Sequence, residues 1–287
     1  MTTNTTTAAN ANATASATGA WRDNLALVQQ LLPFTRRGVH AGDAIYEGGT
    51  PFGHLHLINS GQFKTVNSAA DGRGQVVGLH FRGDWLGFDG IAQGRYACDA
   101  VALDTGEVWS VRYADLLTAS AASPALMRLM HVAMSRQIGR GSDTLLSLGT
   151  LPADARVADF IKDWAQSLAT RGLRTDQITL HMTRAEIGNY LGMTLETVSR
   201  ALRRLAQCGV IRFDEKGRRD LTIPNLRRST NLCAACLNRT AAHACRWLCK
   251  RRQSDFGSAG HGLHSCRRAE KTTAWHRCQA VVLNGGP

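Results

Sequence analysis

The sequence contains no apolar stretch that approaches the roughly 20 residues a helix needs to cross a bilayer. Its N-terminus shows no basic start followed by an apolar run, so we expect no secretory signal. Cysteine is scarce in most of the chain: six of the eight cysteines follow residue 230, which leaves only Cys98 and Cys208 before it. Two cysteines give no disulfide framework. These absences favour a cytoplasmic protein.

Catalytic patterns are also missing. The first half of the chain offers no Ser-His-Asp set, no phosphate-cradling glycine loop and no paired carboxylates at a recognisable spacing, so we expect no enzyme. His54, His56 and His80 leave metal chemistry open, because alternate residues of a strand point to the same face. A strand histidine more often lies in a core or on a surface. These histidines keep one interpretation of the chain open: a small-ligand or metal-binding sensor, or an enzyme, with an incidental helical domain. It is the alternative to the interpretation developed below.

The 287 residues suffice for two domains with proper cores, and the net charge of +12 indicates a polyanionic partner. The charge is unevenly spread. Residues 229–287 hold nine Lys or Arg against two Asp or Glu, whereas the first 228 residues hold 25 against 20. Much of the basic character therefore belongs to the tail.

Residues 183–205 carry the clearest pattern in the chain. Ile187, Tyr190 and Leu191 give one helix an apolar face, and Gly192 suits its end because glycine readily adopts the left-handed conformation. Thr194 is a good N-cap for a second helix, which we expect to bury Val198, Leu202 and Leu205. Two such helices joined by a short turn predict a helix-turn-helix.

The exposed face of the second helix fits the major groove of DNA. Arginine can grip guanine, glutamate can accept from the cytosine amino group, and serine can serve a base or a phosphate. We expect Glu196, Ser199 and Arg200 to read bases, because residues near the N-terminus of such a helix reach base edges. Polar residues around them are expected to contact the DNA backbone: Thr183, Thr194, Thr197, Arg203 and Arg204.

Residues 181–205 closely resemble the DNA-binding helices of the CRP/FNR family of bacterial transcription regulators, the FNR branch in particular. The resemblance runs from about Leu31 to Asn225. It implies an α+β fold with an N-terminal antiparallel β-roll like a cyclic-nucleotide-binding domain, a long dimerisation helix and a C-terminal winged helix-turn-helix. It also implies a homodimer on an inverted-repeat DNA operator, contact with RNA polymerase, and control by oxygen level, redox state or nitrogen oxides.

The local pattern agrees with these expectations. Short apolar runs between glycines, including Gln75 to Phe81 and Val101 to Val111, predict a small antiparallel barrel or roll. Ser123-Pro124 opens a long helix. The expected segments are a disordered N-terminus at 1–20, the roll at 21–122, the dimerisation helix at 123–150, the DNA-binding domain at 151–226 and a basic tail at 227–287.

Two stripes mark the long helix. One repeats at spacings of four and three, as a coiled-coil seam does. We expect the dimer contact to use Met127, Met134, Ile138, Leu145 and Leu148. The second stripe, with Leu126, Leu129 and Met130, suits packing on the roll.

The positions of the roll that hold a ligand or cofactor in the family carry different residues in this chain. Where the cyclic-nucleotide branch holds ribose and phosphate with Gly-Glu and Arg-Ser pairs, this chain has Gly87-Phe88 and the segment 97–100, which contains no arginine and carries Asp99. We therefore expect no cyclic nucleotide at this site, since Phe88 cannot bond a ribose hydroxyl and Asp99 would repel phosphate. The FNR branch implies an iron–sulfur cluster, but no cysteine precedes Cys98 and the roll ligand position lies close to Trp109. We therefore predict no cofactor and no metal, and we expect Cys98 and Cys208 to be packing residues.

The tail beyond residue 226 lacks a sustained apolar period, and we expect it to be disordered. The alternative is a zinc site, since Cys and His at such spacings can form a tetrahedral shell. Its candidate ligands are Cys233, Cys236, Cys245 and Cys249, with His243, His261 and His264 nearby.

Overall fold

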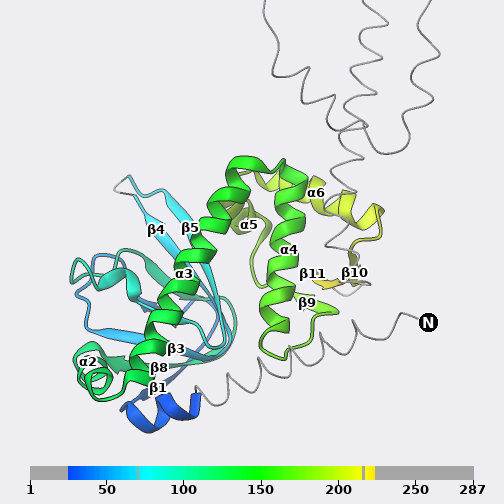
Figure 1. Ribbon diagram of the computed structural model, residues 1–287. Coiled ribbons are helices and arrows are strands. Elements are labelled where there is room, and N and C mark those ends of the chain that lie inside the picture. Colours follow the sequence, from blue (N-terminus) through cyan, green and yellow to red (C-terminus); the bar gives the residue numbers. More distant parts are fainter. Residues whose placement is uncertain (1–24, 70, 215–216, 224–287) are drawn as a thin grey trace, which may run out of the picture. The chain divides into compact units, whose positions relative to one another are not determined.

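The computed structural model describes residues 25–69, 71–214 and 217–223 (Figure 1). The chain divides into two compact units, Met1–Leu237 and Asn238–Pro287, and the second lies wholly outside the described residues. The expectations for the N-terminal segment and for the cysteine-rich tail also lie outside them. Among the described residues, no helix combines the length and the apolarity that crossing a membrane requires.

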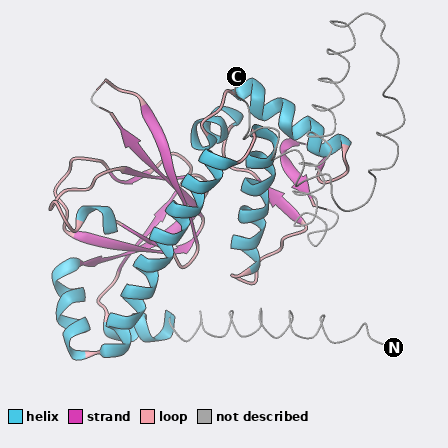
Figure 2. Ribbon diagram, turned by 45° about the horizontal axis from the view of Figure 1, so that its top comes forward, coloured by secondary structure: helices cyan, strands magenta, loops and turns pink. Residues whose placement is uncertain are grey.

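The first domain is a roll of two four-stranded antiparallel sheets, coloured magenta in Figure 2. It follows a short helix at residues 25–31. One sheet has the order β1-β8-β3-β6 and the other β2-β7-β4-β5. The strands are β1 (Thr35–Val39), β2 (Ala44–Tyr46), β3 (His54–Ser60), β4 (Gln62–Ser68), β5 (Gly74–Phe81), β6 (Trp85–Leu86), β7 (Asp99–Ala102) and β8 (Gly106–Arg112), and a short 3-10 helix, η1 (Phe88–Gly90), follows β6.

Two details of the roll differ from the sequence-based expectation. The apolar run from Val101 to Val111 is two strands, β7 and β8, because the chain bends at residues 103–105 and β8 begins at Gly106. A Cβ at Gly106 would lie 2.4 Å from the Ser60 carbonyl oxygen, so the close approach of backbones requires glycine there. The helix α2 (Tyr113–Ala122) was not anticipated, because only Leu116 and Ser120 along it are buried and its apolar period is weak.

The long helix α3 (Pro124–Thr150) begins and ends close to the predicted residues, and Figure 1 shows it as one continuous element. Ser123 caps its start by accepting a hydrogen bond from the Leu126 N–H at 3.3 Å, and Pro124 occupies the first turn. Leu126 and Met130 are buried against the roll, as predicted for the second stripe.

The second domain is a winged helix-turn-helix, and its helices follow the prediction. A three-stranded antiparallel sheet of order β10-β11-β9 forms the wing. The strand β9 was missed, because three residues carry too little pattern to read. The elements are α4 (Ala153–Ala169), β9 (Gln177–Thr179), α5 (Arg184–Leu191), α6 (Leu195–Gln207), β10 (Arg212–Asp214) and β11 (Gly217–Thr222).

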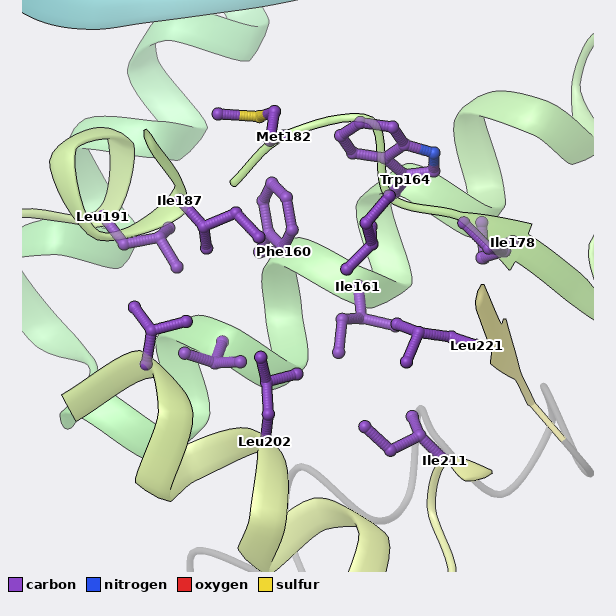
Figure 3. Close-up of a cluster of buried hydrophobic side chains, with 14 of the residues drawn as sticks. Phe160, Ile161, Trp164, Ile178, Met182, Ile187, Leu191, Leu202, Ile211 and Leu221 are labelled. Carbon is purple, nitrogen blue, oxygen red and sulfur yellow. The ribbon is translucent and has the colours of Figure 1, made fainter. Parts of the chain in front are cut away.

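The core of this domain joins all its elements, as Figure 3 shows. Trp164 and Phe160 of α4 meet edge to face, with ring centroids 5.5 Å apart. Ile187 of α5, Leu202 of α6 and Leu221 of β11 are each about 1% exposed. Burying a large aliphatic side chain contributes about 1.5–3 kcal/mol, so this cluster fixes the two helices of the motif on α4 and on the wing.

Candidate nucleic-acid interface

The turn between α5 and α6 is defined by its capping residues. Gly192 ends α5 with φ of 62°, the left-handed conformation predicted for it. Thr194 begins α6, and its hydroxyl accepts a hydrogen bond from the Thr197 N–H at 3.3 Å. A Cβ at Gly188 would lie 2.5 Å from the Met193 carbonyl oxygen. The chain therefore returns tightly over α5, and the angle between the two helices is fixed by backbone contact.

The inner face of α6 is buried as the sequence predicts. Val198, Ala201, Leu202 and Leu205 are at most 3% exposed and pack on α4 and α5. Among the described residues, the opposite face of the helix presents exposed polar side chains, including Glu196, Arg200 and Arg203.

The residues predicted to read bases lie together on that free face. Glu196 and Arg200 are exposed and Ser199 is half-buried. A hydrogen bond from its own backbone N–H, and then one from Thr194, holds the pKa of Glu196 below its ordinary value. Glu196 is therefore an ionised acceptor near neutral pH. The Arg200 guanidinium lies 3.3 Å from the Thr197 hydroxyl and forms no ion pair with another described residue. Side chains of this kind suit base edges.

The predicted backbone-contacting residues fall into two groups. Thr183, Thr194, Thr197 and Arg203 line the N-terminal ends of α5 and α6 or their exposed side. Arg204 differs, because its guanidinium lies 2.5 Å from the Asp154 carboxylate on α4. This ion pair gives Arg204 a role within the domain and competes with the predicted phosphate contact.

The first residue of α6 has an exposed side chain that the sequence reasoning did not single out. Leu195 is 45% exposed, although it lies three residues before Val198 and continues the buried stripe toward the start of the helix. The apolar period predicts burial at this position, so it gave no signal for the exposure.

The predicted dimer seam on α3 is largely uncovered by the other described residues. Ile138 and Leu145 are each 71% exposed and Met127 is 43% exposed. Leu148 is half-buried, and Met134 packs partly against the core of the roll. Met134 therefore lies at the edge of the seam. A row of exposed large apolar side chains at coiled-coil spacing is expected to be covered by another surface.

The interior of the roll is filled by its own side chains. The rings of Tyr46 and Tyr96 stack with centroids 3.9 Å apart, and both are buried. Asp89 accepts hydrogen bonds from the Tyr46 hydroxyl at 3.3 Å and from the Cys98 thiol at 3.3 Å. Burial, and then the Asp89 charge, raises the pKa of Cys98, so this thiol stays protonated. Cys98 is buried, as predicted.

The positions that matter for a phosphate or a ribose are already engaged. Phe88 packs against the apolar core of the roll. Asp99 accepts a hydrogen bond from the Gly48 N–H at 2.7 Å. Phe88 and Asp99 are therefore both engaged by other residues of the roll.

The histidines that left metal chemistry open do not gather into a site. His54 and His56 lie on the same face of β3, with ring centroids 6.3 Å apart. His56 bonds the Ser110 hydroxyl at 2.8 Å, and His80 contacts the Thr65 hydroxyl at 3.2 Å on a different sheet. No group of three or more His, Cys, Asp or Glu side chains able to hold a metal occurs among the described residues.

The expectation for Cys208 was wrong. It was expected to pack in the core, but it forms the C-cap of α6 and is exposed. The helical period places position 208 three residues after buried Leu205, yet the helix ends at Gln207 and Gly209 turns the chain away with φ of 70°.

A winged helix-turn-helix with a free, polar recognition face, joined to a β-roll by a long helix, defines a DNA-binding transcription regulator. The family models agree with this class: the Crp-like helix-turn-helix domain matches residues 155–228, and the cyclic nucleotide-binding domain matches residues 36–123. The chain belongs to the CRP/FNR family and is a transcription regulator rather than an enzyme.

Individual relatives support this assignment. The transcriptional regulatory protein btr of Bordetella pertussis is 33% identical over 190 residues, which are 66% of this chain and 78% of that protein. Electron transport regulator A of Shewanella oneidensis is 34% identical over 181 residues, 63% of this chain and 72% of that protein. The structure of FixK2 from Bradyrhizobium japonicum is 29% identical, covers 70% of this chain and 98% of its own, and has a TM-score of 0.62.

Proposed function

We propose that the protein binds an inverted-repeat operator as a homodimer in the cytoplasm. The exposed seam on α3 carries this proposal, because Ile138 and Leu145 would be covered by the same helix of a second copy. A two-fold dimer presents two α6 helices to half-sites about one helical turn apart. Family membership supports the same arrangement.

Within each half-site, we propose that Glu196, Ser199 and Arg200 read base edges. Thr183, Thr194, Thr197 and Arg203 bind phosphates. Most of these side chains are exposed, Thr197 and Ser199 are half-buried, and all but Arg203 lie in the first half of α5 or α6 or cap its start, which supports these roles. Arg204 is a weaker candidate for a phosphate contact, because its guanidinium is paired with the Asp154 carboxylate.

The signal proposed is oxygen limitation, redox state or nitrogen oxides, acting on transcription through RNA polymerase. Support comes from the relatives: one is named electron transport regulator A, and the fumarate and nitrate reduction regulatory protein of Escherichia coli is 34% identical over 176 residues, 61% of this chain and 70% of that protein. One name refers to electron transport and the other to the reduction of fumarate and nitrate.

We further propose that the roll responds without cyclic nucleotide and without the FNR-type cluster. The stacked tyrosines in its interior, Phe88 in the core and the engaged Asp99 support this. Cys98 is held protonated beside Asp89, whereas cluster iron requires thiolates.

The test is a binding assay on a palindromic operator, a scrambled duplex of equal length and single-mismatch duplexes, all at one moderate salt concentration. Specific reading predicts at least about a hundredfold preference for the palindrome, because non-specific binding is mainly a phosphate effect. Equal affinity for palindrome and scramble would defeat the proposal. Aerobic and anaerobic purification, with absorbance spectra and metal content, tests the cofactor part.

A further inference from the structure

The β4–β5 hairpin of the roll contacts α5, the first helix of the DNA-binding motif. The Asn189 side chain on α5 accepts a hydrogen bond from the Val76 N–H at 2.6 Å and donates one to the Gly74 carbonyl at 2.7 Å. The Gln75 side chain donates to the Asn189 carbonyl. One asparagine thus bonds both polar groups of a strand backbone, which fixes α5 along β5 in a single register.

A charged pair lies next to this contact. Lys64 of β4 bonds Glu186 of α5, and only 16% of the lysine side chain is exposed. Glu186 also belongs to the capping box with Thr183 at the start of α5. Burial opposes ionisation of Glu186, but hydrogen bonds from Lys64 and Thr183 outweigh it and hold its pKa below the ordinary value. The roll therefore pairs with the carboxylate that caps the start of α5, and this contact holds that end of the helix against β4.

A second anchor lies at the other end of β5. Asp84 accepts from Arg140 of α3 at 2.7 Å and from Arg171, which follows α4, at 2.9 Å. Arg171 also donates to the Arg82 carbonyl at 2.5 Å. Asp84 therefore joins the roll, the long helix and the DNA-binding domain through one carboxylate.

Apolar packing connects the two anchors. The Phe81 ring of β5 meets the Trp164 ring of α4 edge to face at 5.3 Å. Val76, Phe81 and Leu103 of the roll belong to the same buried cluster as the core of the DNA-binding domain. Polar and apolar contacts together hold the domain at three separated points, which restrains its rotation.

We infer that Lys64, Asn189 and the Asp84–Arg171 pair are positioning residues for operator binding. They hold each DNA-binding domain on its own roll, so that both recognition helices of a dimer meet their half-sites together. This rests on the proposed function. A tethered but freely rotating domain loses conformational freedom when the second half-site is bound, and this loss lowers the effective concentration of the second helix. A held domain avoids that loss. The interface therefore strengthens binding to the full repeat and leaves binding to one half-site unchanged.

The experiment uses the full chain with Lys64→Gln, Asn189→Ala and the double substitution. Affinity is measured for the full inverted repeat and for a duplex with one half-site, at the same salt concentration. Arg73→Gln is the matched control, because Arg73 is a cation of the same hairpin that pairs with Asp71 of its own turn. Hydrogen exchange at the Val76 amide, which Asn189 protects, reports whether the interface has opened.

We expect the double variant to exchange faster at Val76 and to bind the full repeat about tenfold more weakly, with half-site affinity unchanged within about twofold. Arg73→Gln should match the wild type on both duplexes. A parallel loss on both duplexes would show that the contacts shape α5 itself and would overturn the inference. A gain on the full repeat, or no change despite faster exchange, would overturn it as well. If the wild type itself fails to prefer the repeat over scrambled DNA, the proposed function fails instead.

Discussion

At the scale of single residues, Arg200 and Arg204 make the sharpest comparison. Arg200 lies on the free face of α6 near its N-terminus, and Arg204 bonds Asp154 one turn further along. Arg200→Ala should cost about 1–3 kcal/mol on the matched operator and relax the preference at one base pair. Arg204→Ala should shift the affinity for all sequences equally. Both are measured on matched and single-mismatch operators; a uniform loss for Arg200→Ala would show that the face is misassigned.

The buried histidines give a pH-dependent stability. Burial lowers the pKa of His56 and of His80 to about 4, from 6.5 in the unfolded chain. The unfolded chain therefore binds more protons between these values, so stability is complete above about pH 6.5 and falls as pH decreases toward 4. Each histidine accounts for up to about 3 kcal/mol of that fall.

This prediction is measured by thermal unfolding from about pH 4 to about pH 7.5, a range that spans the window above. His56→Gln with His80→Gln should flatten the curve. His40→Gln is the control, because the His40 side chain is 82% exposed. A curve as steep in the double variant as in the wild type would contradict the assignment.

The capping roles of Thr194 and Gly192 could be predicted because both residues act on groups within three or four residues along the chain. The ion pair of Arg204 could not be predicted, because its partner Asp154 is 50 residues away in sequence. Leu195 was missed for a different reason: apolar periodicity detects burial, and Leu195 is exposed.

At the scale of elements, the glycine at position 188 controls the helix-turn-helix. A methyl group there would lie 2.5 Å from the Met193 carbonyl, which is backbone and cannot turn aside. Gly188→Ala should therefore destabilise the protein by about 1–3 kcal/mol, as overpacking does. Gly139→Ala on α3 is the matched change, since nothing lies within 4 Å of its Cβ. It should stabilise by about 0.5–1 kcal/mol through helix propensity. Chemical denaturation separates the two; equal effects would refute the argument.

The long helix offers a test of dimerisation. Ile138→Glu places a charge on the exposed seam, and we expect it to shift the protein to monomers in sedimentation equilibrium at micromolar concentration. Val132→Glu is a matched control, because Val132 is 41% exposed on the same helix but off the seam. It should remain dimeric. If both variants sediment as the wild type does, the seam is not the dimer contact.

The strong elements were readable because each carries several turns of a single period. This holds for α4 and α6, whose buried positions repeat along the helix, and for α3, whose apolar seam repeats along it although only Leu126 and Met130 are buried. It fails for β9, with three residues, and for α2, which has ten residues and only a weak apolar period. These elements exist because neighbours already present complete them: β9 pairs with β11.

At the scale of the whole molecule, the basic tail is predicted to be dispensable for specificity. Truncation after Asn225 removes all of the positive charge carried by residues 229–287 and leaves every residue that the structure describes, the last of which is residue 223. Dimerisation and operator preference should persist, and affinity for non-specific DNA should fall and depend less on salt. Titration at several salt concentrations measures both. Stoichiometric zinc in the full chain, lost together with folding on truncation, would contradict the prediction.

Contacts between residues far apart in the chain were the feature least predictable from the sequence. The two partners of the Val76–Asn189 bond are 113 residues apart, and neither residue type signals the other. The domain order was readable from motifs. The way β5 serves both domains required the folded chain.

The shared core has a consequence for how such regulators can be recombined. Phe81 and Val76 are built into the first domain yet help to fill the interior of the second. A chimaera that exchanges only the segment after α3 would replace the residues that pack against these two side chains. It would also remove Arg171, which pairs with Asp84. Retargeting by altering a few side chains at the start of α6 keeps that fit. The two domains should therefore be exchanged together, whereas the DNA-reading side chains of α6 can be changed by themselves.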